Sequence, residues 1–178
     1  MGGKLIIFVL RMRILLSGDV MKKANWKTYV FWIGLAEAVG LLSGLLSRSA
    51  TASFNTSVLQ SPLSPPAIVF PIVWTFLYAL MGIGAARIRL APASTQRSRS
   101  MNLFIAQLIV NFFWSPIFFN AGAYGFALLW LLLLWILVLW MILSFRKVDQ
   151  LAALLQIPYL LWLTFAAYLN YAVWALNK

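Results

Sequence analysis

Long apolar runs separated by short polar segments occupy most of this 178-residue chain. A helix needs about 20 apolar residues to cross a hydrocarbon core about 30 Å thick, and five runs approach or exceed that length. We expect membrane-spanning helices at residues 28–47, 67–86, 101–120, 122–145 and 151–174. The runs are continuous and leucine-rich rather than alternating, which disfavours a β-barrel. The pattern therefore predicts an all-α membrane protein, a bundle of five transmembrane helices.

The N-terminal segment differs from these runs. Its apolar stretch, Lys4–Leu16, is short and is interrupted by Arg11 and Arg13, so it does not span a bilayer. Met21 is followed by two lysines, so residues 1–20 are either an interfacial extension or the product of an upstream start codon. We therefore expect a disordered or interfacial extension at residues 1–27 and a five-helix membrane domain at 28–178.

The basic residues are distributed unevenly between the two sides of the expected bundle. The chain has 14 Lys+Arg against 3 Asp+Glu, a net charge of +11. Nine of the basic residues lie on the side where the first span begins: Lys22, Lys23, Lys27, Arg87, Arg89, Arg97, Arg99, Arg146 and Lys147. The opposite side holds Arg48 and Lys178. By the positive-inside rule the N-terminus is cytoplasmic and the C-terminus is outside. The charge is thus a signal of topology, and we expect no nucleic-acid partner.

The chain contains no cysteine and no histidine. Disulfides, thiolate nucleophiles, imidazole–metal sites and triads with an imidazole base are therefore excluded. We expect no metal, no cofactor and no conventional catalytic residue, and an enzymatic function is the less favoured class.

Three spans carry aromatic, amide or small residues at intervals of four, which places each set on one helical face. The sets are Trp74, Tyr78 and Gly82; Gln107, Asn111 and Ser115, with Trp114 beside them; and Trp162, Ala166, Asn170 and Trp174. Such faces are typical of an apolar ligand pocket with a few orienting polar groups. The alternative is that the amides bridge helices while the aromatic residues form interfacial belts. Trp74 and Trp162 lie deep in their spans, which favours the interior for these two.

Trp130, Trp135 and Trp140 of the fourth span have a different setting. They lie in a nearly unbroken Leu/Ile/Val run, so we expect them to face lipid or neighbouring helices and exclude them from the site. The first extramembrane loop, residues 48–66, is the candidate for a lid because it is the only sizeable loop on the outer side.

Glu37 lies near the middle of the first span, where an ionised carboxylate is costly. It either packs helices as a hydrogen-bonded group or serves function, for example by binding a cationic group. No second acidic residue or histidine lies in a span, so no proton pathway can be assembled. Gly40 and Gly44 in the same helix form a GxxxG pair, a close-packing face within the bundle or between protomers.

Three segments also carry a family pattern. They are Pro65-Pro66-x4-Pro71-x2-Trp74-Thr75-x2-Tyr78-x2-Met81-Gly82, then Gln107-x3-Asn111-x2-Trp114-Ser115-Pro116-x-Phe118-Phe119, then Pro158-Tyr159-x2-Trp162-x3-Ala166-x2-Leu169-Asn170-Tyr171-x2-Trp174. This pattern covers about 110 residues, in spans two to five, and resembles the TspO/MBR family. The animal members of that family are the translocator protein, or peripheral benzodiazepine receptor.

The resemblance implies a five-helix bundle, often dimeric, that binds porphyrins, sterols and synthetic aromatic ligands in a pocket under the first loop. It places that pocket at Trp74, Tyr78, Asn111, Trp114, Ser115, Trp162 and Ala166. As a bacterial-type member, the chain would lie in a cytoplasmic membrane as a homodimer. Two positions depart from the family pattern: Leu63 replaces a tryptophan ahead of Pro65-Pro66, and Ala175 replaces a basic residue after Trp174.

The leading hypothesis is a membrane protein that binds tetrapyrroles or other lipophilic aromatic molecules, as a sensor, a sequestering protein or a translocator in a stress response. Its partners would be those small molecules and membrane lipid. One alternative is an enzyme that degrades porphyrin in light through its tryptophans. The other is a scaffold that acts through protein partners.

Overall fold

The computed structural model describes residues 25–178, and within them five helices are long and apolar enough to cross a membrane. They are Asn25–Leu46, α3 (Val69–Leu90), Thr95–Asn120, α5 (Tyr124–Arg146) and Gln150–Leu176. The predicted all-α bundle of five spanning helices is therefore confirmed, with boundaries shifted by a few residues. The prediction of a disordered or interfacial extension falls largely on residues 1–24, which lie outside the described residues.

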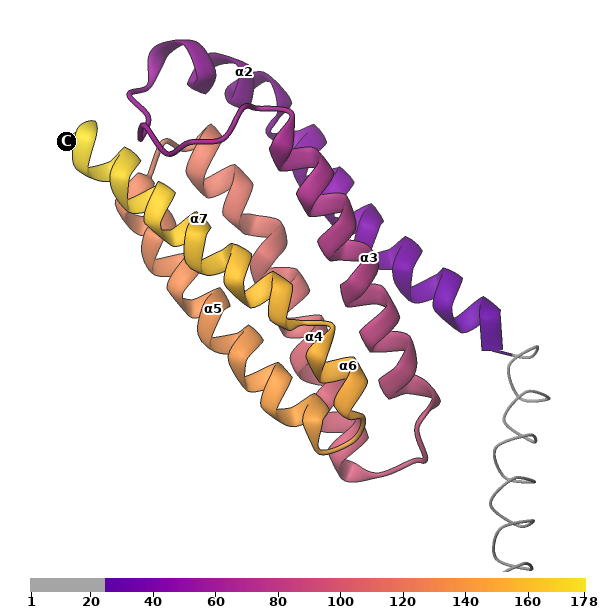
Figure 1. Ribbon diagram of the computed structural model, residues 1–178. Coiled ribbons are helices and arrows are strands. Elements are labelled where there is room, and N and C mark those ends of the chain that lie inside the picture. The colour runs from indigo at the N-terminus through magenta and orange to yellow at the C-terminus, as the bar shows by residue number, and fades with distance from the viewer. Residues whose placement is uncertain (1–24) are drawn as a thin grey trace, which may run out of the picture.

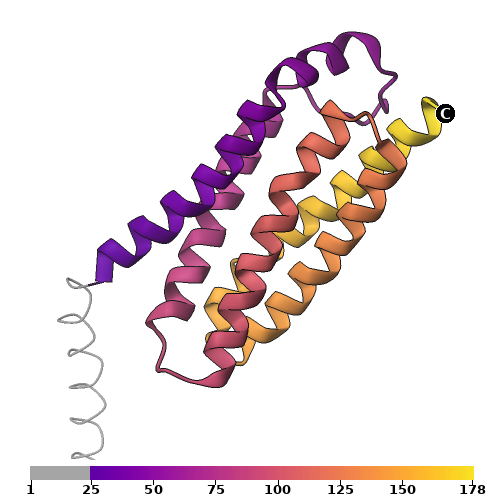
Figure 2. The same cartoon turned by 180° about the vertical axis from the view of Figure 1, so that it is seen from behind.

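The spanning helices run side by side as one bundle (Figures 1 and 2). α5 packs against its neighbours α4 (Thr95–Ser115) and α7 (Ile157–Leu176), whereas the N-terminal helix Asn25–Leu46 lies at the edge of the bundle beside α3. α5 is apolar on all sides, yet only the stripe containing Leu131, Leu134 and Val138 is buried. The remaining apolar surface of α5, such as Leu129 and Ile136, is exposed on the outside of the bundle. This exposure suits a helix in contact with lipid.

Two of the spans are not continuous α-helices. The third consists of α4 (Thr95–Ser115) followed by the π-helix η1 (Pro116–Asn120). Pro116 has no N–H to donate to the carbonyl oxygen of Phe112 one turn earlier. Ser43 Oγ of the N-terminal helix donates to that oxygen instead, at 2.7 Å. A proline defect in one helix is thus used to attach another helix.

The fifth span is also interrupted. It consists of α6 (Gln150–Leu154) and α7 (Ile157–Leu176), separated by Leu155 and Gln156. Pro158 lies in the first turn of α7, where a missing N–H costs no helical hydrogen bond. The break is therefore compatible with the local sequence, although the hydrophobic pattern alone predicts one helix.

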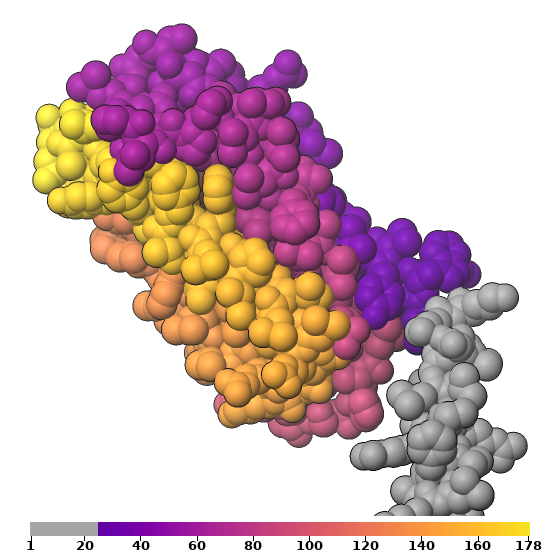
Figure 3. Space-filling model, in the orientation of Figure 1, coloured from indigo at the N-terminus to yellow at the C-terminus, as the bar shows by residue number. Residues whose placement is uncertain are grey.

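The end of the bundle near the C-terminus is covered by the segment that we predicted to be a loop. Part of it forms the helix α2 (Arg48–Ser57), whose Phe54 ring lies 5.3 Å from that of Phe118. Further along, Asn177 holds Leu59 by two hydrogen bonds: the Leu59 N–H donates to Oδ1 at 3.1 Å and Nδ2 donates to the Leu59 carbonyl at 2.9 Å. The segment consequently lies against the end of α7 (Figure 3).

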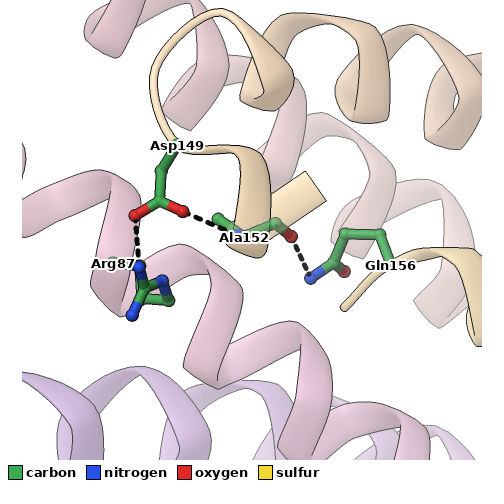
Figure 4. Close-up of polar contacts among 4 residues, drawn as sticks. All are labelled: Arg87, Asp149, Ala152 and Gln156. Atoms are coloured by element: carbon green, nitrogen blue, oxygen red, sulfur yellow. Dashed lines mark hydrogen bonds and ion pairs between the residues drawn. The ribbon is translucent and has the colours of Figure 1, made fainter. Parts of the chain in front are cut away.

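The opposite end is tied together by the turn between α5 and α6 (Figure 4). Asp149 Oδ1 accepts from the Ala152 N–H at 2.9 Å and so caps α6, while Oδ2 pairs with Arg87 of α3 at 2.7 Å. Burial opposes ionisation, yet the hydrogen bond from Ala152 and the guanidinium of Arg87 outweigh it and hold the pKa of Asp149 below its usual range. Gln156 donates to the Leu80 carbonyl of α3 and passes so close to Gly84 that a side chain there would collide with it.

Candidate ligand-binding cavity

A cavity of about 630 Å³ lies among the helices. The N-terminal helix and α3 supply most of its wall, α4 supplies three residues, α5 two and α7 one. The lining is largely apolar, with a small number of polar side chains. The lining residues are Gly34, Glu37, Ala38, Gly40, Leu41, Ser43, Gly44, Leu45, Pro71, Trp74, Thr75, Tyr78, Asn111, Trp114, Ser115, Leu131, Leu134 and Ala166.

The structure brings six of the seven predicted site residues to this cavity: Trp74, Tyr78, Asn111, Trp114, Ser115 and Ala166. The seventh, Trp162, does not line it. Its ring lies at the contact between α3 and α7, 6.0 Å from the ring of Phe70 and 5.7 Å from that of Phe165. Its indole N–H is buried and has no hydrogen-bond partner within the described residues. Ala166, one turn later on the same face, reaches the cavity while Trp162 does not.

The aromatic residues of the wall are arranged in stacked pairs. The Trp74 ring stacks on the Tyr78 ring, with centroids 5.4 Å apart and planes inclined by 30°. The Trp114 ring stacks on Phe118, with centroids 5.0 Å apart and planes inclined by 22°. The first pair lies on α3 and the second joins the end of α4 to η1, and in each pair the two positions are four residues apart. Stacking therefore holds Trp74, Tyr78 and Trp114 in the wall, with Phe118 supporting Trp114 from behind the lining.

A buried hydrogen-bond network lies next to Asn111 and connects three helices. The Tyr78 hydroxyl donates to Asn111 Oδ1, and Asn111 Nδ2 donates to the Tyr159 hydroxyl at 2.8 Å. The Tyr159 hydroxyl donates in turn to Gln107 Oε1 at 3.2 Å, and both Tyr159 and Gln107 are fully buried. The bridging interpretation of the amides thus applies to Gln107. Asn111 both bridges helices and faces the cavity.

Asn170, on the predicted face of the fifth span, is a second bridging amide. Its Oδ1 accepts from the Trp114 indole N–H at 3.3 Å, and its Nδ2 donates to the Tyr124 carbonyl at 2.8 Å. It does not line the cavity. Its role is to fix the orientation of Trp114, which lines the cavity.

The N-terminal helix supplies the part of the wall that sequence reasoning missed. Gly34, Glu37, Ala38 and Leu41 share one face by their spacing, but Gly34 and Ala38 have almost no side chain and Leu41 does not stand out in an apolar span. The two glycines of the GxxxG pair have separate surroundings. A side chain on Gly40 would collide with the Tyr78 ring, whereas Gly44 has open space in front of it. The available signal was the glutamate in an otherwise apolar span.

The three tryptophans excluded from the site lie outside the cavity. Trp130 donates its indole N–H to the Val110 carbonyl of α4 at 2.7 Å. Trp135 donates to Thr164 Oγ1 of α7 at 2.9 Å. Trp140 is 52% exposed on the outer surface. Residues 48–66 do not line the cavity either. They cover the end of the bundle near the C-terminus (Figure 1).

Five spanning helices around an aromatic-walled cavity define a small α-helical integral membrane protein. The chain matches the sequence model of the TspO/MBR family over residues 32–175, and it belongs to that family. The tryptophan-rich protein TspO of Chlorobaculum tepidum is 33% identical over 159 residues, which cover 84% of this chain and 96% of the relative. The translocator protein of Ovis aries is 34% identical over 141 residues, covering 78% and 83%. The tryptophan-rich sensory protein of Cereibacter sphaeroides is 36% identical over 114 residues, covering 64% and 70%.

Proposed function

We propose that this protein binds tetrapyrroles, such as porphyrins, and other lipophilic aromatic molecules in the cavity among its helices. The observation that carries the proposal is the cavity itself, about 630 Å³ in volume with two stacked aromatic pairs and one amide in or beside its wall. Pockets for small molecules commonly enclose about 300–1,000 Å³ and combine apolar walls with a few polar groups. A flat, rigid aromatic ligand could stack on the aromatic rings of this wall.

The ligand would be sensed, sequestered or translocated, and binding is the step common to all three roles. One relative is named a sensory protein and another a translocator protein, which supports the first and third roles by family relationship. Trp74 and Trp114, held by stacking and by the bond to Asn170, would contact the ligand rings. Asn111 would orient a polar group of the ligand.

We further propose a homodimer in a bacterial cytoplasmic membrane, with the N-terminus inside and the C-terminus outside. The distribution of charge along the described helices supports this orientation. Lys27 lies in the first turn of the N-terminal helix, and Arg87, Arg97 and Arg146 lie in or next to the loops that join α3 to α4 and α5 to α6. The start of that helix and both loops are at one end of the bundle (Figure 1). Lys178 lies at the opposite end, where the C-terminus is found.

Titration of the purified protein in lipid nanodiscs with protoporphyrin IX, followed by porphyrin absorbance, tests the proposal. Saturable binding is expected. Trp74→Ala should weaken affinity about 5- to 150-fold, as expected for removal of an aromatic anchor. The matched control is Trp140→Ala, which removes an exposed tryptophan outside the cavity and should leave affinity unchanged. Equal affinities for the two variants would indicate partitioning into lipid and contradict the proposal.

A further inference from the structure

Glu37 gives the cavity an ionisable carboxyl that the proposed function does not explain. It is the one acidic residue in the lining, and no lysine or arginine lines the cavity within the described residues. We propose that Glu37 makes the cavity select its ligands by charge. It favours lipophilic ligands that present an amine and disfavours those that bury a carboxylate. This inference rests on the proposed function and specifies its ligand class.

The position of Glu37 suits contact with a ligand. Gly34 and Ala38 flank it on the same face of the helix, and both are too small to screen its carboxyl from the cavity. Gly40, less than one turn further, touches the Tyr78 ring, so this stretch of helix lies against α3 at the level of the aromatic wall. A ligand lying on Trp74 and Tyr78 would therefore be a neighbour of the carboxyl.

The protein itself provides Glu37 with no partner among the described residues. The ion pair observed among the described residues joins Arg87 to Asp149 at the end of the bundle, and it does not involve Glu37. Arg87 lies nine residues beyond Tyr78 on α3, roughly 13 Å along the helix at 1.5 Å per residue. The Tyr78 hydroxyl already donates to Asn111. The carboxyl thus remains available for a donor group on a ligand.

Low polarity makes this selection strong. Charges interact more strongly in the interior of a membrane protein than in water, because the surroundings screen them less. A ligand amine would supply the counter-charge that Glu37 lacks. A ligand carboxylate buried at the same place would meet a like charge or would have to take up a proton. Glu37 therefore raises the affinity for ligands with an amine and lowers the affinity for ligands with a carboxylate.

Three porphyrins with the same ring provide the test: protoporphyrin IX with its two carboxylates, its uncharged dimethyl ester, and a diamide that carries two tertiary amines. Affinities are measured in nanodiscs of zwitterionic lipid, so that the membrane itself has no net charge. For the unmodified protein the amine derivative should bind at least 10-fold more tightly than the diacid, with the ester between them. Glu37→Gln, which keeps the shape of the side chain, should reduce that ratio to within 3-fold of unity.

Asp149→Asn is the matched control, since it makes the same chemical change at the acidic residue outside the cavity and should preserve the ratio. An unchanged ratio in Glu37→Gln, with all three porphyrins still binding, would overturn the charge selection but leave the proposed function intact. Failure of all three to bind saturably would overturn both. If Glu37→Gln does not fold, the unmodified protein decides: an amine derivative no tighter than the diacid overturns the inference.

Discussion

Tyr159 is the residue on which the hydrogen bonding of the bundle converges. Its hydroxyl accepts from Asn111 and donates to Gln107, so it links α7 to two positions on α4. In a bilayer the apolar surfaces of helices gain little by leaving lipid, and interhelical hydrogen bonds and close packing hold them together. Close packing is supplied here by Gly82, where a side chain would collide with the backbone of Ile33 in the N-terminal helix.

Replacement of Tyr159 by phenylalanine should therefore destabilise the bundle by about 1–3 kcal/mol, because it leaves a buried donor on Asn111 and a buried acceptor on Gln107 unpaired. The measurement is the free energy of unfolding in mixed micelles titrated with a denaturing detergent. Tyr171→Phe is the control, since Tyr171 is 54% exposed, and a change below about 0.5 kcal/mol is expected there. Equal stability of the two variants would show that the network contributes nothing.

At the scale of helices, the hydrophobic pattern was sufficient to place all five spans within a few residues. It could not predict α2, because a Ser- and Thr-rich segment ending in prolines has the composition of a loop. Its helix depends on a tertiary contact, that of Phe54 with Phe118 and Phe119. It also could not predict η1 or the break before α7. At η1 the carbonyl freed by Pro116 finds its partner in the N-terminal helix, and at the break the Gln156 side chain bonds to the Leu80 carbonyl of α3, so both depend on contacts with other helices.

The turn that carries Asp149 predicts a pH dependence of stability. The pKa of Asp149 in the folded protein lies below its usual range, so its carboxylate stabilises the fold above pH 4 and loses that effect as the pH falls through the lowered value. Asp149→Asn keeps a helix-capping side chain but loses the ion pair with Arg87. We expect it to cost about 1 kcal/mol at pH 7 and less at pH 3. Unfolding midpoints at both pH values check this, and a cost independent of pH would contradict it.

At the scale of the whole molecule, the candidate site could be predicted only on the helices that carry large or polar side chains at regular spacing. The faces of the second and third spans did converge, as Trp74 and Asn111 show. The N-terminal helix was missed because glycine and alanine leave no such pattern. Spacing places Trp162 on the same face of α7 as Ala166, yet only Ala166 lines the cavity. The rotation and tilt of α7 decide which residues of that face reach the cavity.

The uneven distribution of basic residues predicts the orientation of the whole protein in the membrane. Fused after Lys178, alkaline phosphatase should be active and green fluorescent protein should be dark, since the first folds outside the cytoplasm and the second within it. The reverse pair of results would place the C-terminus inside. Addition of three lysines after Lys178 is expected to shift part of the population to the opposite orientation, because charges near the ends of spans determine topology.

Photolabelling tests most directly whether the cavity is the ligand site. A porphyrin amide bearing a diazirine is bound to the protein in nanodiscs, irradiated, and located by mass spectrometry of the peptides. We predict labelling within residues 34–45, 71–78 and 111–115, the segments that contain most of the lining residues, and loss of that labelling when excess protoporphyrin IX competes. Labelling confined to the outer surface of α5, around Leu129, Ile136 and Trp140, and insensitive to competition, would contradict the account.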